Sequence, residues 1–189
     1  MKRIVILASG SGTNAENIIK YFKNSDSIRV VKVLSNKKSA KVLDRAAKFG
    51  IENESFSRTD FEITNKMLKF LIDKADYIIL AGFLWKIPQS IIEAFPNKII
   101  NIHPALLPKY GGKGMYGMHV HSAVVENKEK ESGITIHYVN ENYDEGAIIF
   151  QSKVEVSSED SAEDVAQKIH KLEYAHFPKV IENVILQDG

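Results

Sequence analysis

The sequence predicts a doubly wound α/β fold, in which helices cover both faces of a mostly parallel β-sheet. Short apolar runs rich in β-branched residues alternate with segments whose apolar residues recur at helical spacing. This alternation continues from residue 3 to residue 102, and polar or glycine-containing turns separate the runs. Repeated β-α units of this kind form parallel sheets with right-handed crossovers.

The expected elements of this region follow directly from the pattern. Strands are expected at 3–9, 29–35, 54–57, 77–81 and 98–102, and helices at 14–23, 40–49, 60–73 and 88–95. Gly50 favours the end of the second helix, and Asp60 is the expected N-cap of the third.

The pattern changes after residue 102. Residues 104–118 contain two prolines and four glycines, which predicts an irregular segment. A helix is expected at 119–128, followed by two strands at 133–139 and 147–156. An acidic turn separates these strands, so the sheet is expected to end in an antiparallel or mixed edge.

The last expected element is a helix that begins at Ser161. Asp164 stands three residues later, as in a weak capping box. The helix runs towards Tyr174, and Pro178 is expected to kink or break it. We find no internal repeat or linker, so residues 1–189 are expected to form a single domain.

Composition limits the class of protein. The chain has 189 residues, which corresponds to one domain at roughly 150 residues per domain. It has no cysteine, which excludes a disulfide framework and a cysteine nucleophile. The longest apolar run, 77–85, is far shorter than the ~18 residues of a spanning helix. With no signal-peptide cleavage site at the N-terminus, we expect a soluble cytoplasmic protein with no membrane association.

Charge is distributed unevenly although the net charge is only +1. Residues 1–60 contain 12 Lys and Arg against 6 Asp and Glu, which is a net +6. No global charge signal indicates nucleic acid as a partner, and most of these charges are expected to be solvated. The basic segment 1–60 could still attract an anionic ligand if it also contains a binding motif.

A glycine turn follows the first expected strand. Gly10-Ser-Gly-Thr-Asn-Ala15 matches the G-x-G-x-x-A pattern of dinucleotide sites. The stretch at the end of the second strand, Leu34-Ser-Asn-Lys-Lys38, has no acid for a ribose. Glycines let the backbone approach a ligand, and amides at a helix N-terminus favour phosphate. We therefore expect phosphate binding here, with side-chain donors from Thr13 and Asn14.

Two further motifs could carry chemistry. Asn101 and His103 lie on the same side of the fifth expected strand, where an amide and an imidazole could clamp a developing oxyanion. The loop 140–146 contains Asp144. A carboxylate from this loop beside His103 would raise that histidine's pKa and fix its tautomer, although such loops are usually solvated turns.

The remaining histidines are expected to be structural. His119-x-His121 could bind a metal, but acids are few nearby and cysteine is absent, so no metal is expected. The same interpretation applies to His137, His170 and His176.

These motifs together resemble the phosphoribosylglycinamide formyltransferases, a family of folate-dependent enzymes of purine synthesis. The resemblance rests on Gly10–Asn14, Ala81-Gly-Phe83, Asn101-Ile-His-Pro-Ala-Leu-Leu-Pro-Lys-Tyr110 and Asp144-x-Gly146, and extends over residues 3–185. It implies a Rossmann-like formyltransferase fold. It also implies formyl transfer from 10-formyltetrahydrofolate, as cosubstrate, to the amine of glycinamide ribonucleotide.

The resemblance also implies roles for individual residues. His103 corresponds to the general acid, Asn101 to the oxyanion clamp and Asp144 to the carboxylate that raises the histidine pKa. The ribonucleotide would be bound by Gly12, Thr13, Asn14 and Glu173, and the folate by Arg58, Leu84, Trp85, Lys86, Ile87 and Asn101. The loop 140–144 would cradle the pterin through its backbone.

The sequence departs from the family pattern twice. Trp85 stands where the family usually has an arginine, and the segment 111–118 is longer than the family's usual Pro-Gly-Leu. Both departures border expected substrate contacts. A monomer or a weak homodimer is expected.

Several alternatives stay open at this level. The chain could be another folate-dependent formyltransferase, acting on an aminoacyl-tRNA or an amino sugar, or a formyltetrahydrofolate hydrolase, but these normally carry an additional domain. It could be a nucleotide-binding oxidoreductase, which the missing acid after the second strand disfavours. It could also be a nucleotide-sensing module, in which Asn101, His103 and Asp144 would lie scattered.

Overall fold

Strands and helices alternate along the first part of the chain, as predicted. The computed structural model describes residues 1–188, which divide into two compact units. Unit 1 comprises Met1–Ile100 with Asp188, and unit 2 comprises Asn101–Gln187. The sheet has the strand order β3-β2-β1-β4-β5-β6-β7, and β5 runs across the boundary between the units.

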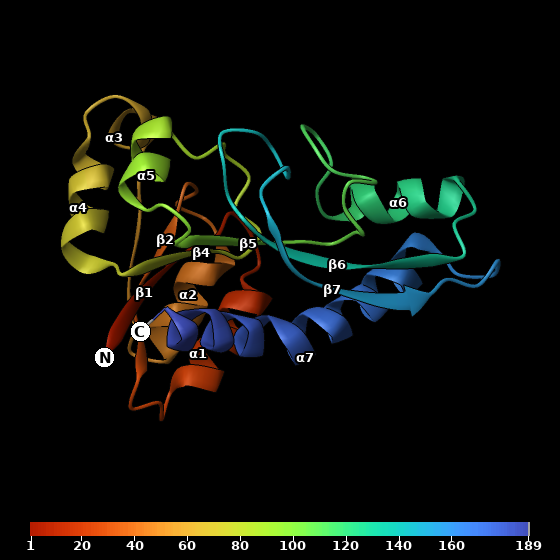
Figure 1. The fold of residues 1–189 in the computed structure, drawn as a ribbon, viewed down its shortest axis with the longest axis horizontal. Coiled ribbons are helices and arrows are strands. Elements are labelled where there is room, and N and C mark those ends of the chain that lie inside the picture. Colours follow the sequence, from red (N-terminus) through yellow and green to blue (C-terminus); the bar gives the residue numbers. More distant parts are fainter. Residues whose placement is uncertain (189) are drawn as a thin grey trace. The chain divides into compact units, whose positions relative to one another are not determined.

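Unit 1 is a parallel α/β unit. Its elements are β1 (Lys2–Leu7), α1 (Thr13–Phe22), β2 (Ile28–Ser35), α2 (Lys41–Lys48), β3 (Glu52–Ser55), α3 (Arg58–Glu62), α4 (Lys66–Lys74), β4 (Tyr77–Leu80), α5 (Gln89–Ala94) and the start of β5 (Ile99–His103). β1 pairs in parallel with β2 and with β4, and β2 pairs in parallel with β3. Figure 1 shows α1 and α2 on one face of these strands and α4 and α5 on the other.

The central strands of unit 1 are buried on both faces, and this explains why their sequences are continuous runs of apolar residues. Ile4, Val5 and Ile6 of β1 have no exposed surface, and Ile78 and Ile79 of β4 have none either. Because β1 and β4 pair in parallel, their carboxyl ends lie at the same edge of the sheet. The Gly10–Asn14 loop and the residues after β4 follow these ends.

The expected helix at 60–73 is two helices instead of one, α3 and α4. Asn65 interrupts it with a left-handed backbone (φ 55°), a conformation that asparagine tolerates better than most residues. The expected N-cap was also wrong. Ser57 caps α3 by accepting from the Asp60 amide at 3.1 Å, and Asp60 is its capping-box partner.

Unit 2 contains the rest of β5, α6 (Met118–Glu126), β6 (Glu131–Tyr138), β7 (Ile148–Glu155) and α7 (Ala162–Gln187). β6 and β7 pair antiparallel, which confirms the predicted edge of the sheet. Helix α7 packs against β6, β7 and α6. The irregular segment predicted after residue 103 extends to α6.

Helix α7 begins as predicted and ends later than predicted. Ser161 accepts from the Asp164 amide at 3.2 Å and donates its own amide to that carboxylate at 3.0 Å, which confirms the capping box. The helix continues through Pro178 to Gln187. Phe177, Pro178 and Ile181 are buried, so packing compensates for the backbone bond that the proline removes.

None of the helices within residues 1–188 combines the length and apolar character needed to cross a membrane. The predicted single domain 1–189 stays a prediction, and Gly189 lies outside the described residues.

Candidate active site

Four polar side chains from three separate segments of unit 2 meet in a buried cluster. Asn101 and His103 come from β5, His137 from β6 and Asp144 from the loop between β6 and β7. His103 Nδ1 lies 3.5 Å from Asp144 Oδ2, and His137 Nε2 lies 3.6 Å from Asp144 Oδ1. Asn101 Nδ2 lies 3.0 Å from His137 Nε2. The structure therefore brings together the three residues that the sequence proposed for chemistry, and it adds His137.

Backbone carbonyls define the tautomers of both histidines, because a carbonyl can only accept a hydrogen bond. His103 Nε2 donates to the Tyr110 carbonyl at 2.7 Å, and His137 Nδ1 donates to the Tyr138 carbonyl at 2.8 Å. With its proton on Nδ1, the His137 ring can accept at Nε2 from the Asn101 amide. A second proton on His103 would sit at Nδ1, facing the Asp144 carboxylate.

Burial and charge act in opposite directions on His103. Its side chain is 5% exposed, and burial lowers its pKa below the ordinary value. The charge of Asp144 and the Tyr110 carbonyl raise the pKa, while His137 lowers it, and the net direction is downward. Asp144 thus acts in the direction that the resemblance implies, but burial of the imidazole outweighs it.

Asp144 is ionised more easily than an ordinary aspartate. Burial opposes its charge, but the His137 side chain, the charge of His103 and the Gly112 amide together lower its pKa. The Gly112 amide donates to Asp144 Oδ2 at 2.9 Å. The loop that carries Asp144 lies against β6: a Cβ on Gly146 would come within 1.7 Å of the Tyr138 carbonyl oxygen, so only glycine fits there.

The segment that follows His103 is held by side chains that the sequence reasoning missed. The buried Thr135 hydroxyl donates to the Ala105 carbonyl at 2.6 Å and accepts from the Leu107 amide at 3.0 Å. Gln151 Nε2 donates to the same hydroxyl at 2.9 Å and to the Leu107 carbonyl at 3.1 Å. Alternation along β6 places Thr135 and His137 on one side of the strand, but nothing in the sequence pairs them with residues 30 positions away.

Glu173, the expected ribonucleotide contact of unit 2, lies on α7 and is 6% exposed. The other expected ribonucleotide residues belong to unit 1. Gly12 has a left-handed backbone (φ 76°) just before α1, and no side chain caps that helix. A Cβ on Gly12 would lie 2.4 Å from the Val42 side chain, so close packing requires glycine here. Thr13 and Asn14 begin α1, where its backbone amides point out of the helix.

One expected folate residue of unit 1, Trp85, belongs to an aromatic cluster. The cluster has ring centroids 5.1–6.3 Å apart and is formed by Phe56, Phe61, Phe83 and Trp85. The Arg58 guanidinium lies over the Trp85 ring at 5.3 Å. The Leu84 amide donates to the Ser9 hydroxyl at 2.9 Å, which ties this segment to the end of β1. Leu84 and Lys86 are exposed, whereas Ile87 is buried.

The His-x-His pair does not assemble a metal site in the part of the chain that the structure describes, where no three His, Cys, Asp or Glu side chains are placed to hold an ion. His119 is exposed, and His121 is buried with no partner for Nδ1 in residues 1–188. The expectation of no metal remains a prediction.

Comparisons with known proteins agree with this geometry. The family model described as formyl transferase matches residues 2–181. The chain is 34% identical to phosphoribosylglycinamide formyltransferase of Bacillus subtilis, over 98% of this chain and 95% of that one. It is 37% identical to the chloroplastic phosphoribosylglycinamide formyltransferase of Arabidopsis thaliana, of which it spans 64%.

A solved structure shares the fold. The crystal structure of phosphoribosylglycinamide formyltransferase from Bacillus halodurans is similar with a TM-score of 0.87 at 31% identity, covering 100% of this chain and 97% of that one. This likeness confirms the predicted α/β fold with its mostly parallel sheet and antiparallel edge.

Fold and cluster together define a formyl-transferring enzyme of the α/β class. The chain belongs to the formyl transferase family, and within it to the phosphoribosylglycinamide formyltransferases. Members of this group formylate glycinamide ribonucleotide in purine biosynthesis, as the resemblance implied. The meeting of Asn101, His103 and Asp144 also argues against a mere nucleotide-sensing module.

Proposed function

We propose that this chain transfers the formyl group of 10-formyltetrahydrofolate to the amine of glycinamide ribonucleotide, with Asn101, His103 and Asp144 as its catalytic residues. The observation that carries the proposal is the buried contact of His103 with Asp144 at 3.5 Å, with the Asn101 amide oriented by His137. Buried groups of this kind are rarely kept only for stability, since desolvation opposes their charged forms.

The reaction begins when the substrate amine attacks the formyl carbon. A new C–N bond forms, and the carbonyl oxygen gains negative charge. The amide N–H of Asn101 that does not face His137 stabilises this oxyanion by a hydrogen bond, and the His103 ring adds a second donor. His137 holds the Asn101 amide, so this donor needs little rearrangement when the charge develops, whereas His103 Nε2 has to leave the Tyr110 carbonyl.

The intermediate then collapses. The bond between the formyl carbon and the folate nitrogen breaks, that nitrogen gains a proton, and the attacking amine loses one. His103 Nε2 is the proton donor in this scheme, because Nδ1 faces Asp144. The Tyr110 carbonyl is its acceptor in the free protein, and the departing nitrogen replaces that carbonyl. Asp144 stabilises the imidazolium that can donate.

Substrate binding follows the residue-by-residue resemblance. The Gly12 loop with Thr13 and Asn14 binds the ribonucleotide phosphate, and Glu173 binds the ribonucleotide. The folate contacts Asn101, Arg58 and the segment 84–87. Within that segment Trp85 offers an aromatic face in place of the family's arginine, and the exposed Leu84 and Lys86 offer the side-chain contacts.

Three further expectations accompany this proposal, on domain organisation, oligomeric state and location in the cell. Residues 1–189 work as one formyltransferase domain, the protein is a monomer or weak homodimer, and it is cytoplasmic. The chloroplastic Arabidopsis relative shows that location varies among the proteins that this chain resembles.

The decisive experiment incubates the purified chain with glycinamide ribonucleotide and 10-formyltetrahydrofolate and follows both products by mass spectrometry. Formylated ribonucleotide and tetrahydrofolate in equal amounts are expected. Parallel reactions with an initiator aminoacyl-tRNA, an amino sugar nucleotide and a nicotinamide cofactor test the alternative functions. Formylation of another acceptor, or release of formate without ribonucleotide product, would overturn the proposal.

A further inference from the structure

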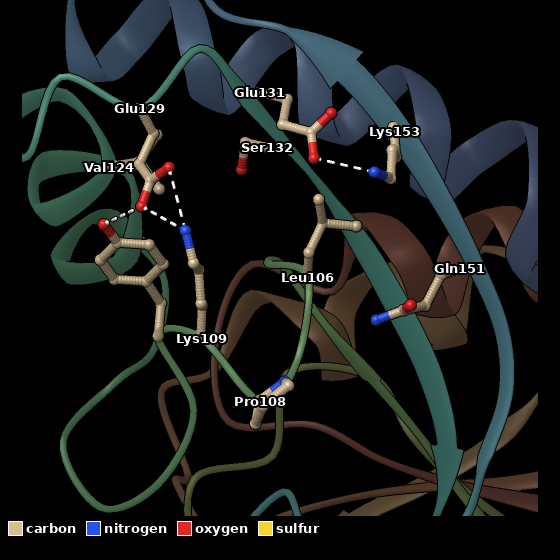
Figure 2. Close-up of a pocket in the computed structure, with 10 residues that line it drawn as sticks. Leu106, Pro108, Lys109, Val124, Glu129, Glu131, Ser132, Gln151 and Lys153 are labelled. Carbon is tan, nitrogen blue, oxygen red and sulfur yellow. Dashed lines mark hydrogen bonds and ion pairs between the residues drawn. The ribbon is translucent and has the colours of Figure 1, made fainter.

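Unit 2 contains a cavity that the catalytic residues do not use. Its volume is about 290 Å³, and it lies between the segment after His103, helix α6 and strands β6 and β7 (Figure 2). It is lined by Leu106, Pro108, Lys109, Tyr110, Val124, Glu129, Glu131, Ser132, Gln151 and Lys153. Small-molecule sites begin at about this volume, so a ligand here has to be small.

One wall of the cavity presents an unused hydrogen-bonding group. Ser132 is 3% exposed, and its hydroxyl has no hydrogen-bond partner among the residues of the described chain. Figure 2 shows this oxygen pointing into the space between Lys109 and Leu106. A buried hydroxyl without a partner costs about 1–3 kcal/mol, so an occupant that bonds to it is favoured.

The charged groups of the cavity are balanced and lie on two sides. Lys109 Nζ lies 3.0 Å from the Glu129 carboxylate, which also accepts from the Tyr110 hydroxyl at 3.0 Å. On the other side Lys153 Nζ lies 2.8 Å from Glu131 (Figure 2). A ligand with a net charge of either sign would meet a like charge, whereas a zwitterion can place each of its charges beside an opposite one.

The rest of the lining is apolar apart from Gln151, whose amide already donates to Thr135 and to the Leu107 carbonyl. Leu106, Pro108 and Val124 come from two different segments and offer surface to a short hydrocarbon group. Size, charge balance, the free hydroxyl and this apolar wall thus describe one class of ligand.

We propose that this cavity binds a free α-amino acid with a small apolar side chain. One of the two lysines receives the carboxylate, the glutamate across the cavity receives the ammonium group, and Ser132 bonds to the carboxylate. The side chain of the ligand packs on Leu106 and Val124.

The cavity is linked to the catalytic cluster through one residue. The side chain of Tyr110 lines the cavity, and its carbonyl accepts from His103 Nε2 at 2.7 Å. An occupant that shifts Tyr110 therefore changes turnover without competing with either substrate. This kinetic consequence rests on the proposed function, whereas binding itself does not.

The test is isothermal titration calorimetry of the full chain with glycine, L-alanine and L-valine. L-valine methyl ester, which lacks the carboxylate, and N-acetyl-L-valine, which lacks the ammonium group, serve as comparison ligands. Saturable binding of at least one amino acid is expected, with about 10-fold weaker binding of both valine derivatives. If none of the three amino acids binds at millimolar concentration, or if the derivatives bind equally well, the proposal is wrong.

Variants locate the binding site. Lys153→Gln and Ser132→Val should each weaken binding by about 10-fold. Lys130→Gln is the matched control, because Lys130 is exposed and does not line the cavity. Should Ser132→Val fail to fold, the exposed Lys153→Gln decides alone. Unchanged binding by Lys153→Gln, or displacement of the amino acid by glycinamide ribonucleotide or folate, would assign the binding to another site.

Discussion

Unit 1 and unit 2 present their candidate functional groups in different ways. In unit 1 the Gly10–Asn14 loop is a short continuous stretch, and its shape depends on the backbone of Gly12 and its contact with Val42. In unit 2 the cluster draws Asn101, His103, His137 and Asp144 from β5, β6 and a loop. The first arrangement can bind a ligand through amides, whereas the second can move a proton.

This difference predicts how each unit responds to substitution. Changes in the unit 2 cluster should lower kcat, because they alter groups that act on the transition state. Changes in the unit 1 loop should affect stability or the KM for the ribonucleotide, because they alter a binding surface. A change in unit 1 that lowers kcat alone would contradict the comparison.

His103→Ala is expected to have the largest effect. Loss of a positioned general acid lowers kcat by about 10²–10⁴, with modest changes in either KM. Steady-state kinetics with both substrates measures it, and circular dichroism confirms that the variant is folded. Turnover near that of the native chain would remove His103 from the mechanism.

Asp144→Asn keeps the shape of the side chain and deletes its charge. Because the Asp144 charge raises the pKa of His103, the already lowered pKa should fall further in the variant. The donor form of His103 becomes rarer, and kcat falls by about 10–10² at neutral pH while both substrates still bind. NMR titration of His103 in both proteins measures the shift. An identical titration with unchanged kcat would make Asp144 a bystander.

His121→Leu tests a buried group of unit 2 that the mechanism does not use. Burial, and then the charges of His170 and His103, lower the pKa of His121 from 6.5 to about 4. Between these values the unfolded chain binds a proton that the folded chain does not, so stability falls as the pH falls. The native chain should lose about 2 kcal/mol from this group between about pH 7 and pH 5, and the variant should not.

Urea unfolding at both pH values measures this difference. Two other histidines, His103 and His170, also have lowered pKa values, and each makes stability fall as the pH falls. The comparison is therefore between the native chain and the variant. Equal pH dependence in both would show that His121 titrates normally.

Gly12→Ala and Gly10→Ala form a matched pair in unit 1. At Gly12 the backbone is left-handed and a Cβ would lie 2.4 Å from Val42, so alanine should cost about 1–3 kcal/mol. At Gly10 nothing lies within 4 Å of the added Cβ, so the cost should stay within about 0.5 kcal/mol. Chemical denaturation of both variants measures the two costs. Equal costs would mean that the Val42 contact does not constrain the loop.

Thr13→Val should have the smallest effect. The substitution removes one hydroxyl at the start of α1 and keeps the side-chain shape. If that hydroxyl bonds to the ribonucleotide phosphate, KM for the ribonucleotide rises by about 5-fold, while kcat and the folate KM stay unchanged. A rise in the folate KM instead would place the folate, not the phosphate, at this loop.

Local patterns in the sequence determined the α/β alternation, the Gly10–Asn14 turn, the Ser161 capping box and the antiparallel pair β6–β7. Each depends on residues within a few positions of one another, or on the burial of a strand on both faces. The proposal of Asn101, His103 and Asp144 as a catalytic set needed the family resemblance in addition, since no local pattern joins β5 to a loop some 40 positions away.

Tertiary structure decided the rest. Asn65 divides one predicted helix into two, and packing carries α7 through Pro178, because neither outcome depends on local propensity alone. His137 and Thr135 acquire roles only when β6 is placed beside the segment that follows β5. The pKa of His103 depends on burial as well as on Asp144, and burial is a property of the folded chain that no run of neighbouring residues contains.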